Sequence, residues 1–198
     1  MPVQVHIEFP NENAVTLSPK FLAESRGVVT IKGRGNTIEI GEPFLPNAAH
    51  FTLTGGATIR VRPSSNLNRL HVHALAEEVS INIGEWASFN GSSQIMAHER
   101  SSIVIGTRCL FGDGCVVTSS DVHKILDNRT GERLNPARDI IVGDHVWIAP
   151  RVNLLRGATI GADSVVGTGA VVTGAFPPNV SIAGTPARII REGITWEL

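Results

Sequence analysis

A six-residue repeat over residues 142–177 constrains the fold more than any other feature of the sequence. Written in sixes from Val142, six consecutive blocks each begin with an aliphatic residue, and the second position holds Gly, Ala, Leu or Thr. A short fixed period is the signature of a solenoid. Alternate residues of a strand share one face, so each block predicts one short strand followed by a corner. Gly, Asp and Asn suit these corners because they adopt positive φ at low cost.

A longer period precedes the hexads, over residues 28–118. Four segments with an alternating aliphatic pattern recur every 21 or 22 residues, and they close at Ile40, Val61, Ile83 and Ile105. A second register recurs at Ile31, Leu53, Val72, Ile95 and Val117. We therefore predict wider, less regular coils of the same solenoid. A meandering β-sandwich also fits the alternation, but the steady spacing and the hexads that follow favour the solenoid.

The remaining boundaries follow from where these periods stop. Residues 1–27 are expected to form a cap that covers the open strand edge at the end of the solenoid. Residues 119–139 repeat nothing and predict an extruded loop, which in a regular scaffold usually carries function. Residues 140–186 hold the regular coils. Residues 187–198 form a short tail, whose Trp196 packs either on the solenoid or on a neighbouring subunit.

Composition excludes several classes of function. The net charge of −1 gives no basic field for nucleic acid or an anionic membrane. No apolar run approaches the length of a membrane span. The first residues lack the charged and apolar regions of a signal peptide, so a cytoplasmic location is expected. Aromatic residues make up only 5% of the chain, which suits many thin layers of Val and Ile better than one bulky core.

The cysteines and one histidine pair give weak signals. Cys109 and Cys115 occupy the fifth position of adjacent blocks and are predicted to be small core residues rather than a disulfide or a reactive pair. His71 and His73 share a strand face, but no Cys or carboxylate lies at a useful spacing. We expect surface or interface histidines there, and no metal site.

Three stretches carry a family resemblance. The first is Ser-Ser-Asp-Val-His at 119–123, the second is Thr-Gly-Glu-Arg-Leu-Asn-Pro at 130–136, and the third is Ile-Val-Gly-Asp-His-Val-Trp-Ile at 141–148. Together with the hexads they resemble the hexapeptide-repeat acyltransferases, most closely the O-acetyltransferases of bacterial capsule sugars such as sialic acid polymers. The resemblance implies an all-β, left-handed parallel β-helix, although parallel crossovers are ordinarily right-handed. It also implies acetyl-CoA as the donor and a homotrimer.

The same resemblance assigns the catalytic residues. It makes His123 the general base, a role that suits imidazole because it exchanges protons near neutral pH. It places Trp147 in the active site, as a wall for the substrate or a hydrogen-bond donor to the thioester oxygen. Asp121 lies two residues from His123 and would orient the ring if this piece is extended. His145 is the rival base.

Two further sets of residues are expected to bind ligands. The loop residues Lys124, Arg129 and Arg133 are basic, and Arg in particular clamps carboxylates of the kind found on acidic sugars. The acetyl-CoA groove is expected between two solenoids, where small residues allow backbone N–H groups to approach the cofactor. The residues assigned to it are Ala149, Gly167, Thr168, Thr173 and Arg188.

The sequence thus predicts an O-acetyltransferase that acts on a sugar or polysaccharide hydroxyl by direct attack in a ternary complex. Two alternatives remain open at this point. One is N-acetylation of an amino- or nucleotide-sugar, which would use the same base. The other is a non-catalytic β-helix scaffold, which would not bind acetyl-CoA.

Overall fold

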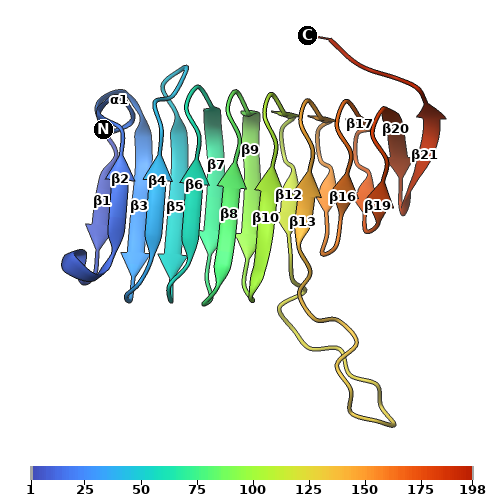
Figure 1. Ribbon diagram of the computed structural model, residues 1–198, viewed down its shortest axis with the longest axis horizontal. Helices are drawn as coiled ribbons and strands as arrows, with labels where there is room; N and C mark the ends of the chain where they lie inside the picture. The colour runs from blue at the N-terminus through green and yellow to red at the C-terminus, as the bar shows by residue number, and fades with distance from the viewer. Residues whose placement is uncertain (1, 198) are drawn as a thin grey trace.

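The computed structural model describes residues 2–197 and shows a parallel β-helix. Its first sheet contains β1 (Gln4–Ile7), β3 (Arg26–Lys32), β5 (Ala48–Thr54), β7 (Asn66–Ala74), β9 (Ser88–Ala97), β11 (Leu110–Phe111), β12 (Val116–Thr118), β14 (Trp147–Ile148), β15 (Asn153–Leu154), β17 (Val165–Val166), β18 (Val171–Val172), β20 (Val180–Gly184) and β21 (Ala187–Glu192). Its second sheet contains β2 (Ala14–Leu17), β4 (Thr37–Ile40), β6 (Thr58–Val61), β8 (Val79–Ile83), β10 (Ser101–Ile105), β13 (Ile140–Val142), β16 (Thr159–Ile160) and β19 (Ala175–Phe176). Figure 1 shows the coils stacked along one axis, from the N-terminus in blue to the C-terminus in red. The predicted left-handed parallel β-helix is confirmed.

The cross-section changes along the helix axis. In the first coils one long strand, such as β9, alternates with one shorter strand. β9 then pairs with both β11 and β12, so its two halves continue as two separate faces of the later coils. From there on, each coil has three short strands, as six-residue blocks require.

The core is a set of aliphatic rows that run along the helix axis. Ile38, Ile59, Ile81, Ile103 and Ile140 occupy equivalent positions in successive coils, and all five are fully buried. Phe89 and Phe111 stack with their ring centroids 4.5 Å apart. Because each buried side chain packs on its equivalent in the next coil, the sequence period and the contact pattern coincide.

One of the two predicted registers contains an error. The row through Ile40, Val61, Ile83 and Ile105 is correct, but Leu53 pairs with Ala74 rather than with Val72, which pairs with Phe51. The pairing shifts at the start of β5 because Arg69, at φ 54°, is an extra residue opposite it. A β-bulge of this kind moves every later residue of the strand by one position, which accounts for one of the two positions between Val72 and Ala74.

The N-terminal segment is more than the cap expected for residues 1–27. β1 pairs with β3 and β2 pairs with β4, so this segment forms a further coil of the solenoid. A short 3₁₀ helix (Pro10–Glu12) separates the two strands. Helix α1 (Pro19–Glu24) follows β2 and inserts Phe21 into the core, edge-on to Phe51 at 6.2 Å. No helix within residues 2–197 is long and apolar enough to cross a bilayer.

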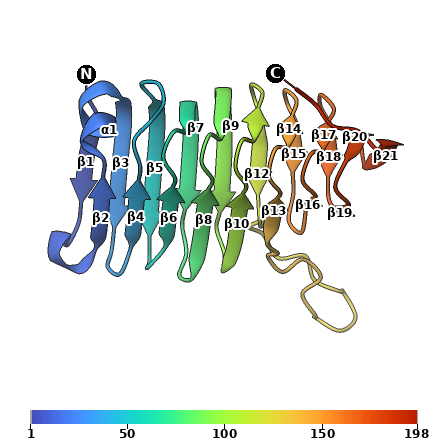
Figure 2. The ribbon, with the colours of Figure 1, turned by 45° about the horizontal axis from the view of Figure 1, so that its top comes forward.

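The two irregular segments lie at opposite edges of the helix. Residues 119–139 project from one edge between β12 and β13, whereas the C-terminal tail runs along the other edge (Figures 1 and 2). In the tail, β21 turns back and pairs antiparallel with β20.

Candidate functional site

The segment 119–139 is an ordered hairpin, which we call the arm. Its two sides pair through Leu134 N–H to the Ile125 carbonyl at 2.8 Å and Asp127 N–H to the Glu132 carbonyl at 2.8 Å. The Asp127 carboxylate accepts hydrogen bonds from the amides of Arg129 and Thr130 and closes the turn. These amides hold the pKa of Asp127 below its usual value. The arm therefore has a defined shape.

His123 lies at the base of the arm, directly after a tight turn. Its N–H donates to the Asp121 carbonyl at 2.6 Å, and Val122 between them has φ 63°. This pattern is a γ-turn, and positive φ is rare for a β-branched residue. The Ser120 hydroxyl accepts a hydrogen bond from Val122 N–H at 2.9 Å and helps to hold the turn. Residues 121–123 are therefore not extended, which was the condition for Asp121 to share a face with His123.

Asn135 ties the two sides of the arm together at the level of His123. Its side chain is 1% exposed, and its amide nitrogen donates to the His123 carbonyl at 2.8 Å and to Asp121 Oδ2 at 2.9 Å. Its oxygen accepts from Ile125 N–H at 2.6 Å. One buried side chain thus binds the carbonyl of the candidate base, the Ile125 amide after it and the Asp121 carboxylate before it. We missed Asn135 because a single Asn in a loop sequence looks like a turn residue.

Asp121 does not orient the His123 ring. Its Oδ2 accepts hydrogen bonds from the Asn135 amide and from Arg156 Nε at 2.8 Å, and these partners lower the pKa of Asp121. No hydrogen bond joins its carboxylate to the imidazole in the described chain. Asp121 instead anchors the arm to the next coil through Arg156.

Arg133, expected to contact the substrate, is also an anchor. Its guanidinium makes two hydrogen bonds to Glu99, of 2.5 and 2.8 Å, and Ser120 donates to the same carboxylate. These donors lower the pKa of Glu99 from 4.5 to about 2. Lys124 and Arg129 are exposed, and Arg129 lies 3.8 Å from Asp127. Of the predicted set, Lys124 alone has no ion-pair partner among residues 2–197, whereas Arg129 pairs loosely with Asp127.

The Glu99 pKa predicts a pH-dependent attachment of the arm. A carboxylate whose pKa is lowered by folding stabilises the native state above its unfolded pKa, and that contribution is lost as pH falls through the folded value. Glu99→Gln should therefore lower the denaturation midpoint at neutral pH. The difference from the unsubstituted protein should shrink as pH falls from 4.5 towards 2. Glu132→Gln, an exposed change on the same arm, is the control, and a difference that is constant with pH would contradict the assignment.

Trp147 lies on the outer face of β14. The corner between β13 and β14 precedes it, at the end of β13 that is farther from the arm. It is 38% exposed, and Trp196 from the tail packs against it with ring centroids 6.1 Å apart. Trp196 also stacks on His145 at 4.4 Å and donates its indole N–H to the His145 carbonyl at 2.8 Å. The tail therefore packs on the solenoid. Within one chain the arm and the Trp147 corner are at opposite edges, so the structure does not bring His123 and Trp147 together.

His145, the rival base, is held by two contacts. Its Nδ1 lies 2.9 Å from Asp163 Oδ1, and its ring is covered on one side by Trp196. These contacts hold the imidazole in one orientation, so His145 has a structural role at the corner between β13 and β14.

Most amides near Trp147 are already used within the coils. The N–H groups of Gly143, His145, Trp147 and Ala149 donate to carbonyls of neighbouring coils at 2.8–2.9 Å. They are therefore unavailable to an oxyanion. The Trp147 indole N–H has no partner among the hydrogen bonds of residues 2–197, and it remains a candidate donor.

The expected cofactor residues divide into two groups. Ala149 and Gly167 are neighbours in consecutive coils, but their amides donate to the carbonyls of Val166 and Ile182, so these N–H groups are not free. A Cβ at Gly167 would lie 2.8 Å from the Ala183 methyl, which explains why the position is small. Thr168, Thr173 and Arg188 are exposed. These three can contact a cofactor through their side chains.

The cysteines and the remaining histidines take no part in this arrangement. Cys109 and Cys115 are buried and free, as predicted, and burial raises the pKa of Cys109 to about 11. His50 and His71 stack at 4.8 Å, and burial followed by repulsion from His50 lowers the pKa of His71. No group of three or more possible metal ligands occurs among residues 2–197.

Comparison with known proteins shows which sequences and structures this chain resembles. Residues 139–174 match the sequence model described as bacterial transferase hexapeptide (six repeats). A polysialic acid O-acetyltransferase of Neisseria meningitidis is 29% identical over 157 residues, which cover 79% of this chain and 72% of that protein. The chain therefore carries the bacterial transferase hexapeptide repeat and is similar over most of its length to a polysialic acid O-acetyltransferase. The resemblance seen in the sequence is thereby confirmed.

Two solved structures of hexapeptide-repeat acyltransferases extend the comparison. The crystal structure of the polySia-specific acetyltransferase NeuO superimposes with a TM-score of 0.84 over 100% of this chain and 83% of that one; at 24% identity it supports the fold alone. A hexapeptide-repeat acetyltransferase of Vibrio cholerae, solved with acetyl coenzyme A, is 29% identical over 61% of this chain and 63% of that one, with a TM-score of 0.50.

Proposed function

We propose that the protein transfers the acetyl group of acetyl-CoA to a hydroxyl of an acidic, capsule-type polysaccharide. The observation that carries the proposal is His123 on an arm whose backbone is fixed on both sides of the imidazole. A general base must be held in one place to meet its proton, and the arm supplies that rigidity. The meningococcal relative, named as a polysialic acid O-acetyltransferase, supports the acceptor class, and the acetyl coenzyme A complex of the Vibrio relative supports the donor.

The reaction is a direct transfer. His123 takes the proton of the sugar hydroxyl as the oxygen attacks the thioester carbonyl of acetyl-CoA. A tetrahedral intermediate forms, and the Trp147 indole N–H donates a hydrogen bond to its oxyanion. The carbon–sulfur bond then breaks, the acetyl group stays on the sugar oxygen, and the imidazolium returns its proton to the CoA thiolate.

The arm also supports a homotrimer in which each site is shared. It exposes about half of each of four apolar side chains, which are Val122, Ile125, Leu126 and Leu134. Apolar side chains gathered on a projecting hairpin are suited to packing on another protein surface. His123 and Trp147 are at opposite edges of one chain, so a second copy is needed to bring an arm to a Trp147 corner. Acetyl-CoA would lie in the groove between the two copies, near Thr168, Thr173 and Arg188.

The test combines binding with acceptor screening. Calorimetry should show that the protein binds acetyl-CoA, and release of free CoA thiol should accelerate when an acidic polysaccharide is added. Neutral oligosaccharides and amino sugars serve as parallel acceptors. Absence of acetyl-CoA binding would leave only the scaffold, and acceleration confined to amino sugars would replace O-acetylation by N-acetylation.

A further inference from the structure

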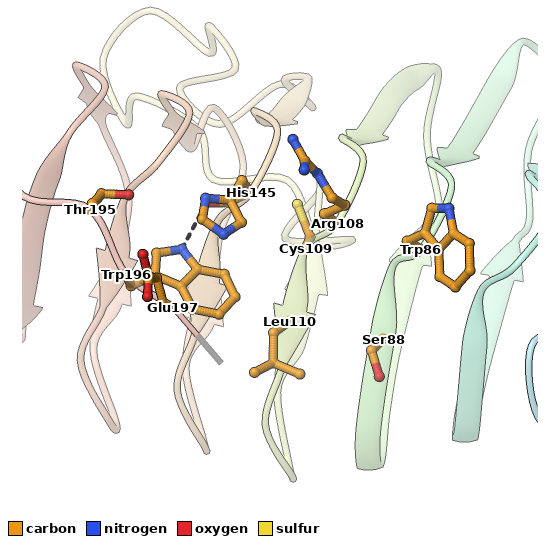
Figure 3. A pocket seen from close by; sticks show the side chains of 9 residues that line it. All are labelled: Trp86, Ser88, Arg108, Cys109, Leu110, His145, Thr195, Trp196 and Glu197. Atoms are coloured by element: carbon orange, nitrogen blue, oxygen red, sulfur yellow. Dashed lines mark hydrogen bonds between the residues drawn. The ribbon is translucent and has the colours of Figure 1, made fainter.

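A hollow of about 510 Å³ is lined by residues of the C-terminal tail and of the coil corners beside it. Three successive corners and the tail line it, and Figure 3 shows Trp86, Arg108 and His145 from the corners with Trp196 from the tail. Its size falls within the range of small-molecule sites in proteins, about 300–1,000 Å³. None of the roles described above uses Trp86 or Arg108.

One wall of the hollow is held rigidly in place. Trp196 stacks on His145 with an interplanar angle of 11°, and its indole N–H is bonded to the His145 carbonyl. His145 is in turn held by Asp163. Trp196 also contacts Trp147, so this wall joins the hollow directly to the tryptophan proposed for catalysis. A ligand in the hollow is therefore a neighbour of the reaction site.

The other wall is an indole that the fold itself does not bury. Trp86 is 50% exposed and has Phe44 on one side, with ring centroids 5.4 Å apart. An aromatic side chain combines a broad apolar surface with a polar N–H, which suits contact with ligands that are part apolar and part polar. The two indoles stand on opposite sides of Leu110 and Arg108 in Figure 3.

Arg108 supplies a charge without a fixed partner. The ion pairs among residues 2–197 include those of Arg133 and Arg156 on the arm side, but none involves Arg108. An unpaired guanidinium beside a hollow is suited to binding a carboxylate through two parallel hydrogen bonds. Glu197 lines the tail side, so an anionic group is favoured at the Arg108 side.

We propose that this hollow is a subsite for one acidic sugar unit of the polymeric acceptor. The sugar's carboxylate pairs with Arg108, and the apolar faces of its ring lie against Trp86 and Trp196. The proposal rests on the proposed function. It assigns recognition of the sugar's carboxylate to Arg108, at the corners beside Trp147, instead of to Arg133 on the arm, which is neutralised by Glu99. The subsite predicts a preference for a polymer, because one unit is held while a neighbouring unit is acetylated.

Calorimetry with two matched probes tests the subsite. The probes are sialic acid oligomers and the same oligomers with their carboxylates reduced to alcohols. Arg108→Gln should weaken binding of the acidic oligomer about tenfold, the cost of one lost charge-assisted contact, and leave the reduced oligomer unaffected. Trp86→Ala should weaken both. Arg34→Gln, which removes an exposed arginine in the first coils, is the control and should change neither. Thermal midpoints of the variants verify that each is folded.

The outcomes separate this proposal from the proposed function. Unchanged binding of the acidic oligomer by Arg108→Gln or by Trp86→Ala would overturn the subsite. Acetylation of neutral sugars without any binding of acidic oligomers would overturn it too, while the transferase assignment stands. Binding that depends on Arg108 in a protein that neither binds acetyl-CoA nor transfers acetyl would support the subsite and refute the transferase.

Discussion

His123→Ala is expected to lower the turnover number for acetyl transfer by about 10²–10⁴-fold, the usual contribution of a general base. Acetyl-CoA should bind as before, because the residues expected to contact the cofactor lie in the last coils. Steady-state kinetics and calorimetry on the same preparation measure the two properties separately. The physical reason is that His123 carries the one imidazole among residues 119–139, and both its N–H and its carbonyl are hydrogen-bonded.

His145→Ala is the informative comparison for this prediction. His145 is in contact with Asp163 and Trp196, and its loss should disturb the tail and acceptor binding more than the turnover number. If His145→Ala abolishes transfer while His123→Ala retains most of it, the base has been assigned to the wrong histidine.

Asn135→Ala should lower turnover by about 10–100-fold although Asn135 touches no reacting atom. Small misplacements of a catalytic group are known to cost rates of this size. The substitution leaves the His123 carbonyl and the Ile125 amide without partners at the base of the arm. A fully buried polar group that loses its partner costs about 1–3 kcal/mol. These two groups are only part-buried, so we expect the arm to open locally and expose them to water. Asn135 is therefore a positioning residue.

The readout must distinguish positioning from general instability. Hydrogen exchange should accelerate within residues 121–135 of the Asn135→Ala variant and remain unchanged in the coils, while the KM for acetyl-CoA stays constant. Asn128→Ala, at the exposed tip of the arm, should alter neither rate nor exchange near His123. Normal turnover in a variant whose arm exchanges rapidly would show that arm rigidity is irrelevant to catalysis.

The coils could be predicted from the sequence because their contacts are periodic. Ile103 packs between Ile81 and Ile140 at equivalent positions, so the spacing of the aliphatic residues predicts which of them are buried. The row through Leu53 marks the limit of this reasoning: its partner Ala74 lies two positions beyond the predicted Val72, and the bulge at Arg69 accounts for only one of them.

The site was less predictable because its contacts are not periodic. Arg133 binds Glu99, which lies 34 residues earlier in the chain, and Asp121 binds Arg156, which lies 35 residues later. Trp196 reaches His145 across 51 residues. No spacing rule links such pairs, so the basic arm looked like a substrate clamp and Asp121 looked like the partner of His123. His123 and Trp147 were identified through the family resemblance rather than through any pattern of their own.

The most direct test of the account is the chemical identity of the product. An acidic oligosaccharide incubated with acetyl-CoA and the protein should gain acetyl groups that mass spectrometry detects and mild alkali removes, with one CoA released for each group. His123→Ala should give almost none under the same conditions. Alkali-stable acetylation, or equal yields of ester from the His123→Ala variant, would contradict O-acetyl transfer by this base.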